Sequence, residues 1–237
     1  MTPPMPTRDC RRGSLVVLVA LMCACSSHAQ RPQNITGAEM AMLPDYCVDT
    51  QGFGYGDAYS PSPRASYWVA RMGPTFWHQH HYCWALIKKH RALEPGLSLQ
   101  VRNGRLGDAI GDLEYVVRNS TPDFPLLPEV FYRIGEIQLL IGNQLAAKEA
   151  LDEAVRRKPD YWPAYLIWAD ALTKAKLTRE AMTHLELGLR QSPNSPQLRK
   201  AYRALGGDPR AFVASMPASA AETATSGASG RASKSSP

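Results

Sequence analysis

The side chains best suited to chemistry are concentrated in one short segment. Within six residues the sequence places His78, His80, His81 and Cys83. Imidazole and thiolate groups bind zinc, copper or haem iron. On a helix, His78 and His81 are neighbours three residues apart, while His80 and Cys83 form a second such pair on an adjacent face. One helix therefore cannot close a tetrahedral site, and a metal site at the three histidines would need a more distant ligand such as Asp45 or His90.

Two other readings of this segment stay open. Trp77, His81 and Trp84 share a helix stripe, and such side chains pack well when their N–H groups find partners. Catalysis would need a nucleophile beside an oriented base, and the sequence supplies such residue types without showing that they lie within reach of each other. The chain contains no HExxH or CxxCH signature, no phosphate loop and no nucleophile elbow. We therefore expect a protein that is not an enzyme and needs no cofactor, with a metal- or haem-binding protein as the alternative.

Length and composition fit one ordinary core-forming domain with tails. The chain has 237 residues, of which 44% are apolar. Its 27 Lys and Arg exceed its 21 Asp and Glu, which gives a net charge of +6. Because the basic residues are scattered along the chain, this mild excess is weak evidence for nucleic-acid binding. We expect no nucleic acid among the partners.

The first 29 residues are typical of an export signal. Basic residues from Arg8 to Arg12 precede an uncharged apolar run from Leu15 to Cys25, which is too short to span a membrane. Small residues before Gln30 allow cleavage after Ala29. The sequence Met-Cys-Ala-Cys ending at Cys25 also resembles a bacterial lipobox, which would make Cys25 the lipidated first residue. We expect a periplasmic or outer-membrane protein, attached through Cys25 in the second case.

Two further features follow from export and composition. Cys47 and Cys83 are the only cysteines beyond the signal. In an oxidising compartment such a pair is interpreted first as a disulfide, with two free thiols or a thiol ligand as the alternative. At the other end, residues 213–237 are mostly small and polar, and from Met216 on they lack the aromatic and branched aliphatic side chains that offset the entropy of ordering. We predict a disordered tail there.

A period of 34 residues organises the second half of the chain. The matched pairs are Phe131 and Tyr165, Ile134 and Trp168, Gly135 and Ala169, Ala147 and Ala181, Leu151 and Leu185, Ala154 and Gly188, and Pro159 and Pro193. This period and pattern resemble the tetratricopeptide repeat. The resemblance covers residues 128–161 and 162–195. Gln138 and Leu172 depart from it, since the family usually has Tyr there, and so does Lys176 where the first copy has the turn glycine Gly142.

The resemblance implies an all-α fold, a short solenoid of antiparallel helix pairs with covered ends. Residues 74–127 would form a degenerate first repeat, with helices over 75–93 and 105–118 and a long connection over 94–104. Residues 30–73, rich in aromatic residues and glycine, would form an irregular cap with short helices at 36–43 and 63–72. Residues 196–212 would form the capping helix.

Repeats of this family hold a peptide or partner protein in a concave groove lined by first helices. Carried over to this chain, the groove positions are Tyr132, Glu136, Leu139, Leu166, Asp170 and Thr173. They are apolar and acidic, and lack the Lys, Asn and Arg with which one subclass clamps a terminal carboxylate. We therefore predict a scaffold or adaptor of the bacterial envelope that binds an apolar or basic segment of another envelope protein. Alternatively, Glu136 and Asp170 are ordinary solvated residues.

Overall fold

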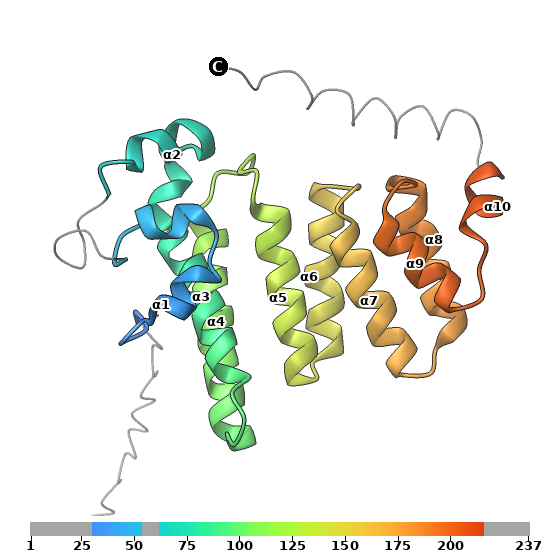
Figure 1. Ribbon diagram of the computed structural model, residues 1–237, viewed down its shortest axis with the longest axis horizontal. Helices are drawn as coiled ribbons and strands as arrows, with labels where there is room; N and C mark the ends of the chain where they lie inside the picture. Colours follow the sequence, from blue (N-terminus) through green and yellow to red (C-terminus); the bar gives the residue numbers. More distant parts are fainter. Residues whose placement is uncertain (1–29, 54–61, 216–237) are drawn as a thin grey trace, which may run out of the picture.

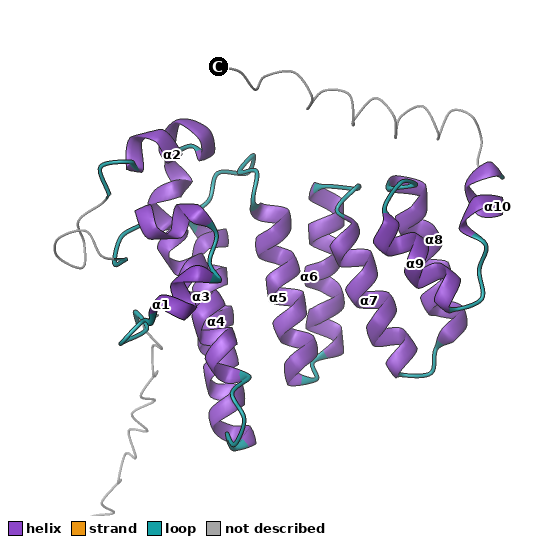
Figure 2. Ribbon diagram, viewed as in Figure 1, coloured by secondary structure: helices purple, strands orange, loops and turns teal. Residues whose placement is uncertain are grey.

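The computed structural model describes residues 30–53 and 62–215, and these residues are helical without any strand (Figure 2). The predicted all-α class is confirmed. The helices stand side by side in a row that runs from the N-terminal to the C-terminal end of the described chain (Figure 1). The predicted signal peptide with Cys25 lies outside the described residues, and so does the predicted tail from residue 216 on. Residues 213–215 are described, and 213 and 214 belong to a helix that spans Pro209–Ala214, so the predicted start of the tail at residue 213 is wrong.

From residue 79 on, consecutive helices pack against one another along this row. The elements are α1 (Gly37–Ala41), the 3-10 turn η1 (Asp45–Asp49), α2 (Ala65–Met72), the 3-10 turn η2 (Pro74–His78), α3 (Gln79–Ala92), α4 (Leu99–Arg118), α5 (Leu127–Ile141), α6 (Gln144–Arg157), α7 (Trp162–Lys174), α8 (Thr178–Gln191), α9 (Pro196–Ala204) and α10 (Pro209–Ala214). The closest pairs are α3 with α4, α5 with α6, and α7 with α8. Each pair is a helical hairpin.

The two hairpins with the 34-residue period turn in the same way. Gly142, at the end of α5, has a φ of 93°, in the left-handed region that closes many helices. Lys176, which occupies the same place after α7, has a φ of 64° although it carries a side chain. The turn geometry is thus kept in the second copy without its glycine.

Small residues let the paired helices approach closely. A Cβ atom on Gly135 of α5 would lie 2.6 Å from Leu151 Cγ of α6. A Cβ atom on Gly188 of α8 would lie 2.9 Å from Tyr165 Cβ of α7. Neither distance is compatible with ordinary packing, so each hairpin depends on a small residue at its point of closest contact.

Two expected boundaries differ from the structure. α4 begins at Leu99, within the segment that we expected as a connection, because the Ser98 hydroxyl accepts the backbone N–H of Val101 and starts the helix early. A second helix, α10, also follows α9 where the sequence suggested only a single capping helix. Asp208 accepts the backbone N–H of Arg210, and Phe212 packs 5.8 Å from the Tyr202 ring.

The N-terminal cap lies over α3 and is joined to it covalently. The predicted disulfide between Cys47 and Cys83 is confirmed, with both residues fully buried. Beside it, the Tyr46 ring packs on the rings of Trp68 and Tyr82. The core of this end of the molecule therefore combines residues of the cap with residues of α3.

An ion pair provides a second link between the cap and α3. Arg91 of α3 donates to the carboxylate of Glu39 in α1, which also accepts the backbone N–H of its own N-cap Thr36. These hydrogen bonds, the Arg91 contact above all, lower the pKa of Glu39 to about 2. Glu39 therefore binds a proton less readily in the folded chain than in the unfolded chain.

The depressed pKa of Glu39 predicts a pH-dependent contribution to stability. The contribution is complete above the unfolded pKa near 4.5 and is lost as the pH falls towards 2. We expect Glu39→Gln to cost about 1–2 kcal/mol near neutral pH, after a discount for solvent screening. Urea unfolding at about pH 6 and about pH 3 should show this difference shrinking by half or more. A difference that stays constant with pH would contradict the assignment.

Candidate functional site

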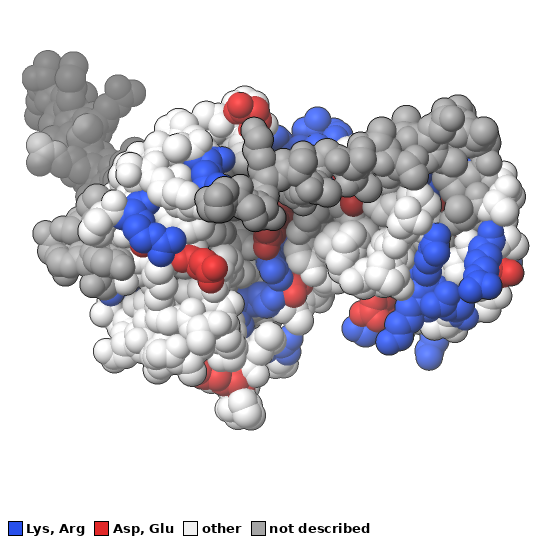
Figure 3. Space-filling view, turned by 45° about the horizontal axis from the view of Figure 1, so that its top comes forward, with Lys and Arg blue, Asp and Glu red and all other residues white. Residues whose placement is uncertain are grey.

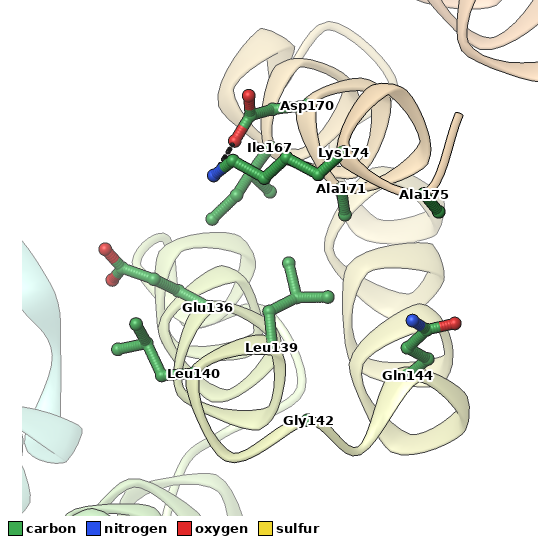
Figure 4. Close-up of a pocket in the computed structure, with 10 residues that line it drawn as sticks. All are labelled: Glu136, Leu139, Leu140, Gly142, Gln144, Ile167, Asp170, Ala171, Lys174 and Ala175. Carbon is green, nitrogen blue, oxygen red and sulfur yellow. Dashed lines mark ion pairs between the residues drawn. The ribbon is translucent and has the colours of Figure 1, made fainter. Parts of the chain in front are cut away.

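A groove lies between the first helices of the two repeated hairpins. It has a volume of about 470 Å³ and runs between α5 and α7, with the start of α6 at one end (Figure 4). Its apolar lining includes Leu139, Leu140, Ile167 and Ala171. In the close-up, the Leu139 side chain points towards α7, and Glu136 and Asp170 lie at the same end of the groove. Three of the six predicted groove residues, Glu136, Leu139 and Asp170, thus line one depression.

The two carboxylates in this groove differ in their freedom to bind a partner. Glu136 is only 20% exposed and is held by Lys89 of α3 at 2.6 Å and by Arg133 of α5 at 3.2 Å. Asp170 is 55% exposed and pairs only with Lys174, which is itself 76% exposed, at 2.6 Å. Because an exposed pair of this kind contributes little, a cation from a partner can replace Lys174. Glu136 joins two helices, and Asp170 is the accessible acid.

The charges around Glu136 extend into a network that joins α3 to α5. Arg133 also contacts Glu129 at 3.3 Å, and the Tyr82 hydroxyl of α3 donates to Glu129 at 2.6 Å. Burial raises the pKa of Tyr82 well above its usual value, which keeps this hydroxyl protonated. The network therefore fixes one wall of the groove against the neighbouring hairpin.

The other three predicted groove residues lie elsewhere. Tyr132 packs edge-on against Tyr161, with centroids 5.8 Å apart. Leu166 packs into the apolar cluster that α7 forms with α8 and α9. The Thr173 hydroxyl donates to the Ala169 carbonyl of its own helix at 2.8 Å. These side chains support the fold around the groove instead of lining it.

Several residues that line the groove were not predicted from the sequence. Ile167, Ala171 and Lys174 of α7 line the groove where Leu166 and Thr173 were expected. Neighbouring helix positions differ by about 100° in direction, so an error of one position moves a predicted side chain off the groove. The 34-residue match identifies α7 as a helix, but it does not determine how α7 is rotated about its axis relative to α5. The apolar and small character of Ile167 and Ala171 was the available signal.

The histidine cluster forms a packed polar network between α3 and α4. His81 Nδ1 donates to Asp112 Oδ1 over 2.7 Å. Lys88 Nζ lies 2.6 Å from Asp112 Oδ2 as an ion pair without hydrogen-bond alignment. The His81 ring also lies on Tyr115, with centroids 3.9 Å apart. Asp112 is fully buried, and these two partners offset the cost of removing its carboxylate from water.

The remaining histidines of the cluster have separate partners. His78 Nδ1 lies 3.4 Å from the Tyr115 hydroxyl, and His80 Nδ1 lies 3.0 Å from the Trp77 carbonyl. Burial lowers the pKa of both rings, that of His80 to about 4, with a further contribution from the neighbouring His81. Both are therefore neutral at physiological pH.

The alternative of a metal site at His78, His80 and His81 has no support among the residues that the structure describes. In that part of the chain no three His, Cys, Asp or Glu side chains are placed so that they could hold a metal ion. The thiol of Cys83 is also taken up in the disulfide. Each of the three histidines instead has a partner at hydrogen-bond distance, which supports the interpretation of packed, hydrogen-bonded side chains. Metal analysis of the purified protein remains the direct test of the alternative.

No protein-family model, curated protein or solved structure matches the chain. Within residues 30–53 and 62–215, no helix combines the length and the apolar character that a membrane span needs. A functional assignment therefore has to come from the residues of this chain.

Proposed function

We propose that the chain is an interaction scaffold or adaptor of the bacterial envelope, and that its tetratricopeptide-like hairpins bind a segment of a partner protein between α5 and α7. The observation that carries this proposal is the groove of about 470 Å³, which lies between the first helices of two sequence-related hairpins. Its apolar walls favour an apolar side chain of the partner. The accessible Asp170 favours a basic residue beside that side chain.

Two features of the chain support the cell envelope as its location. The buried disulfide between Cys47 and Cys83 fits an oxidising compartment. The apolar run that ends at Cys25 has the features of a secretory or lipoprotein signal. Together they support a partner in the periplasm or at the outer membrane, and an anchored form of the protein if Cys25 carries a lipid.

The proposal predicts that filling the groove removes the partner. Ala175 is exposed at the end of α7 and lines the groove, so Ala175→Trp should occupy it without disturbing the core. We expect binding to weaken by about 10-fold or more, as for the loss of a central interface contact. Asp170→Lys should weaken it as well, because it places like charge opposite a basic partner residue.

The test is affinity capture from native envelope extract, followed by quantitative mass spectrometry. Ala41→Trp is the matched control, since Ala41 is exposed on α1, away from the groove. Glu136→Lys is unsuitable as a probe, because it would place a third cation beside Lys89 and Arg133 and disturb the fold. Capture of the same proteins by the native chain and by Ala175→Trp would refute the groove assignment.

A further inference from the structure

The positive charge of the described chain resides at its C-terminal end. From Lys174 to Ser215 there are eight Lys and Arg against three Asp and Glu, a net charge of +5. The preceding described residues, 30–53 and 62–173, carry 14 Lys and Arg against 15 Asp and Glu, a net charge of −1. Basic residues are thus scattered along the whole sequence, but the excess of positive charge is local.

The same two regions also differ in the fraction of their basic side chains that form ion pairs. Before Lys174, ten of the 14 basic side chains have a carboxylate within 4.0 Å. From Lys174 on, among the described residues, only Lys174 has one. The seven others are Lys176, Arg179, Arg190, Arg199, Lys200, Arg203 and Arg210. We call these seven residues the basic end. Within the described residues none of them has a carboxylate within 4.0 Å, although Arg199 donates to the Pro193 carbonyl and the Asn194 side chain and Arg190 lies over the Phe212 ring. Their charges are therefore not neutralised within the described chain, which leaves them available to an anionic partner.

The basic end is an exposed surface. All of its side chains except the half-buried Arg199 are exposed. In α9, Leu198 and Tyr202 are buried against the preceding hairpin, so Lys200 and Arg203 remain on the outside. The space-filling view shows Lys and Arg gathered at the end of the molecule where Figure 1 places α8 to α10 (Figure 3). Few acidic side chains interrupt them in this view.

Apolar side chains in the same stretch indicate which anion would bind. Leu177 is 44% exposed, directly after Lys176 and two residues before Arg179, and Leu187 of α8 is 48% exposed. Basic residues beside exposed leucines are the combination that binds membrane interfaces, where cations meet phosphates and apolar side chains enter the headgroup layer. Binding of single-stranded nucleic acid relies instead on aromatic stacking. The exposed large aromatic residues of the described chain, Tyr67 and Trp77, lie at the opposite end.

We propose that the basic end docks onto the phosphate headgroups of an anionic lipid surface, with Leu177 entering the headgroup layer. Each unpaired cation near such a surface strengthens binding by about five-fold. The contact is reversible, because no single residue of the basic end inserts deeply. None of the seven residues of the basic end lines the groove between α5 and α7, although Lys176 directly follows the lining residue Ala175. Docking would fix the row of helices by one end at the membrane.

The test is co-sedimentation of the full chain with vesicles of phosphatidylcholine, alone or mixed with phosphatidylglycerol. The comparison between the two vesicle types removes any contribution of a lipid on Cys25, which would act on both. The variant Lys200→Glu with Arg203→Glu should lose at least about 25-fold in affinity for anionic vesicles. The control variant Arg31→Glu with Lys158→Glu reverses two exposed charges outside the basic end and lowers the net charge equally. It should bind like the native chain.

Two further measurements are binding at increased salt concentration and binding of other polyanions. Raising the salt from about 0.05 M to about 0.5 M should release the native chain, since exposed charges are screened. Equal binding to both vesicle types would overturn the proposal, and so would an equal loss in the two charge variants. Tight binding of duplex DNA or polyglutamate without binding to anionic vesicles would also overturn it, in favour of a different partner class. Unchanged helicity and thermal midpoints should show that the variants fold.

Discussion

Replacing Asp112 with alanine is expected to lower the free energy of unfolding by about 3–5 kcal/mol. Asp112 is fully buried on α4 and holds two side chains of α3, His81 at 2.7 Å and Lys88 at 2.6 Å. Its removal leaves Lys88, which is only 13% exposed, as an unpaired cation between the two helices. The cost is large because a buried charge without its partner keeps its full desolvation penalty.

Urea unfolding followed by circular dichroism measures this effect. Asp108→Ala is the matched control, because Asp108 is an exposed carboxylate one turn earlier on the same helix. It should change stability by no more than about 0.5 kcal/mol. If Asp112→Ala proves as mild as Asp108→Ala, the His81–Asp112–Lys88 network does not stabilise the α3–α4 hairpin as described.

The double variant Cys47→Ala with Cys83→Ala is expected to lose roughly 3–4 kcal/mol. The disulfide joins positions separated by 36 in the sequence and restricts the unfolded chain accordingly. Both cysteines are fully buried, and the disulfide is the covalent link between the cap and α3, beside the hydrogen bonds of Arg91 to Glu39, Gln33 and Asn34 and the packing of Tyr46 on Tyr82. The loss should therefore be largest in the cap and in α3.

Hydrogen exchange measured by mass spectrometry can locate this loss. We expect faster exchange in α1 and η1 and unchanged exchange in α7 and α8, because rows of packed helices open locally. Reduction of the native chain under mild denaturant serves as the control and should reproduce the pattern, while the double variant should not respond to reductant. A uniform change along the whole chain would contradict the assignment of the disulfide to the cap.

The sequence was most informative where a pattern repeats or where chemistry is local. The 34-residue period located both hairpins, and its small residues Gly135 and Gly188 lie where a Cβ atom would meet a side chain of the paired helix within 3 Å. The cysteine count identified the disulfide. The start of α4 was missed because an N-cap serine, Ser98, outweighs the glycines that follow it in the helix.

The groove could be predicted only in part. Helical periodicity identifies the apolar stripe of α7, but the choice between Leu166 and Ile167 depends on how the helix is rotated against α5. The role of Glu136 depends on Lys89, which belongs to a different hairpin and has no sequence pattern that links it to Glu136. Contacts between helices far apart in the sequence decide these points, and a single sequence does not reveal them.

Site-specific photo-crosslinking tests the central claim most directly, namely that the chain holds a partner polypeptide between α5 and α7. A photoreactive residue would replace Ala175, which lines the groove, or Glu149, which lines a separate depression between α4, α5 and α6. In envelope extract we expect one defined adduct from position 175 and no such adduct from position 149. The same adduct at equal yield from position 149, or none from position 175, would contradict the account.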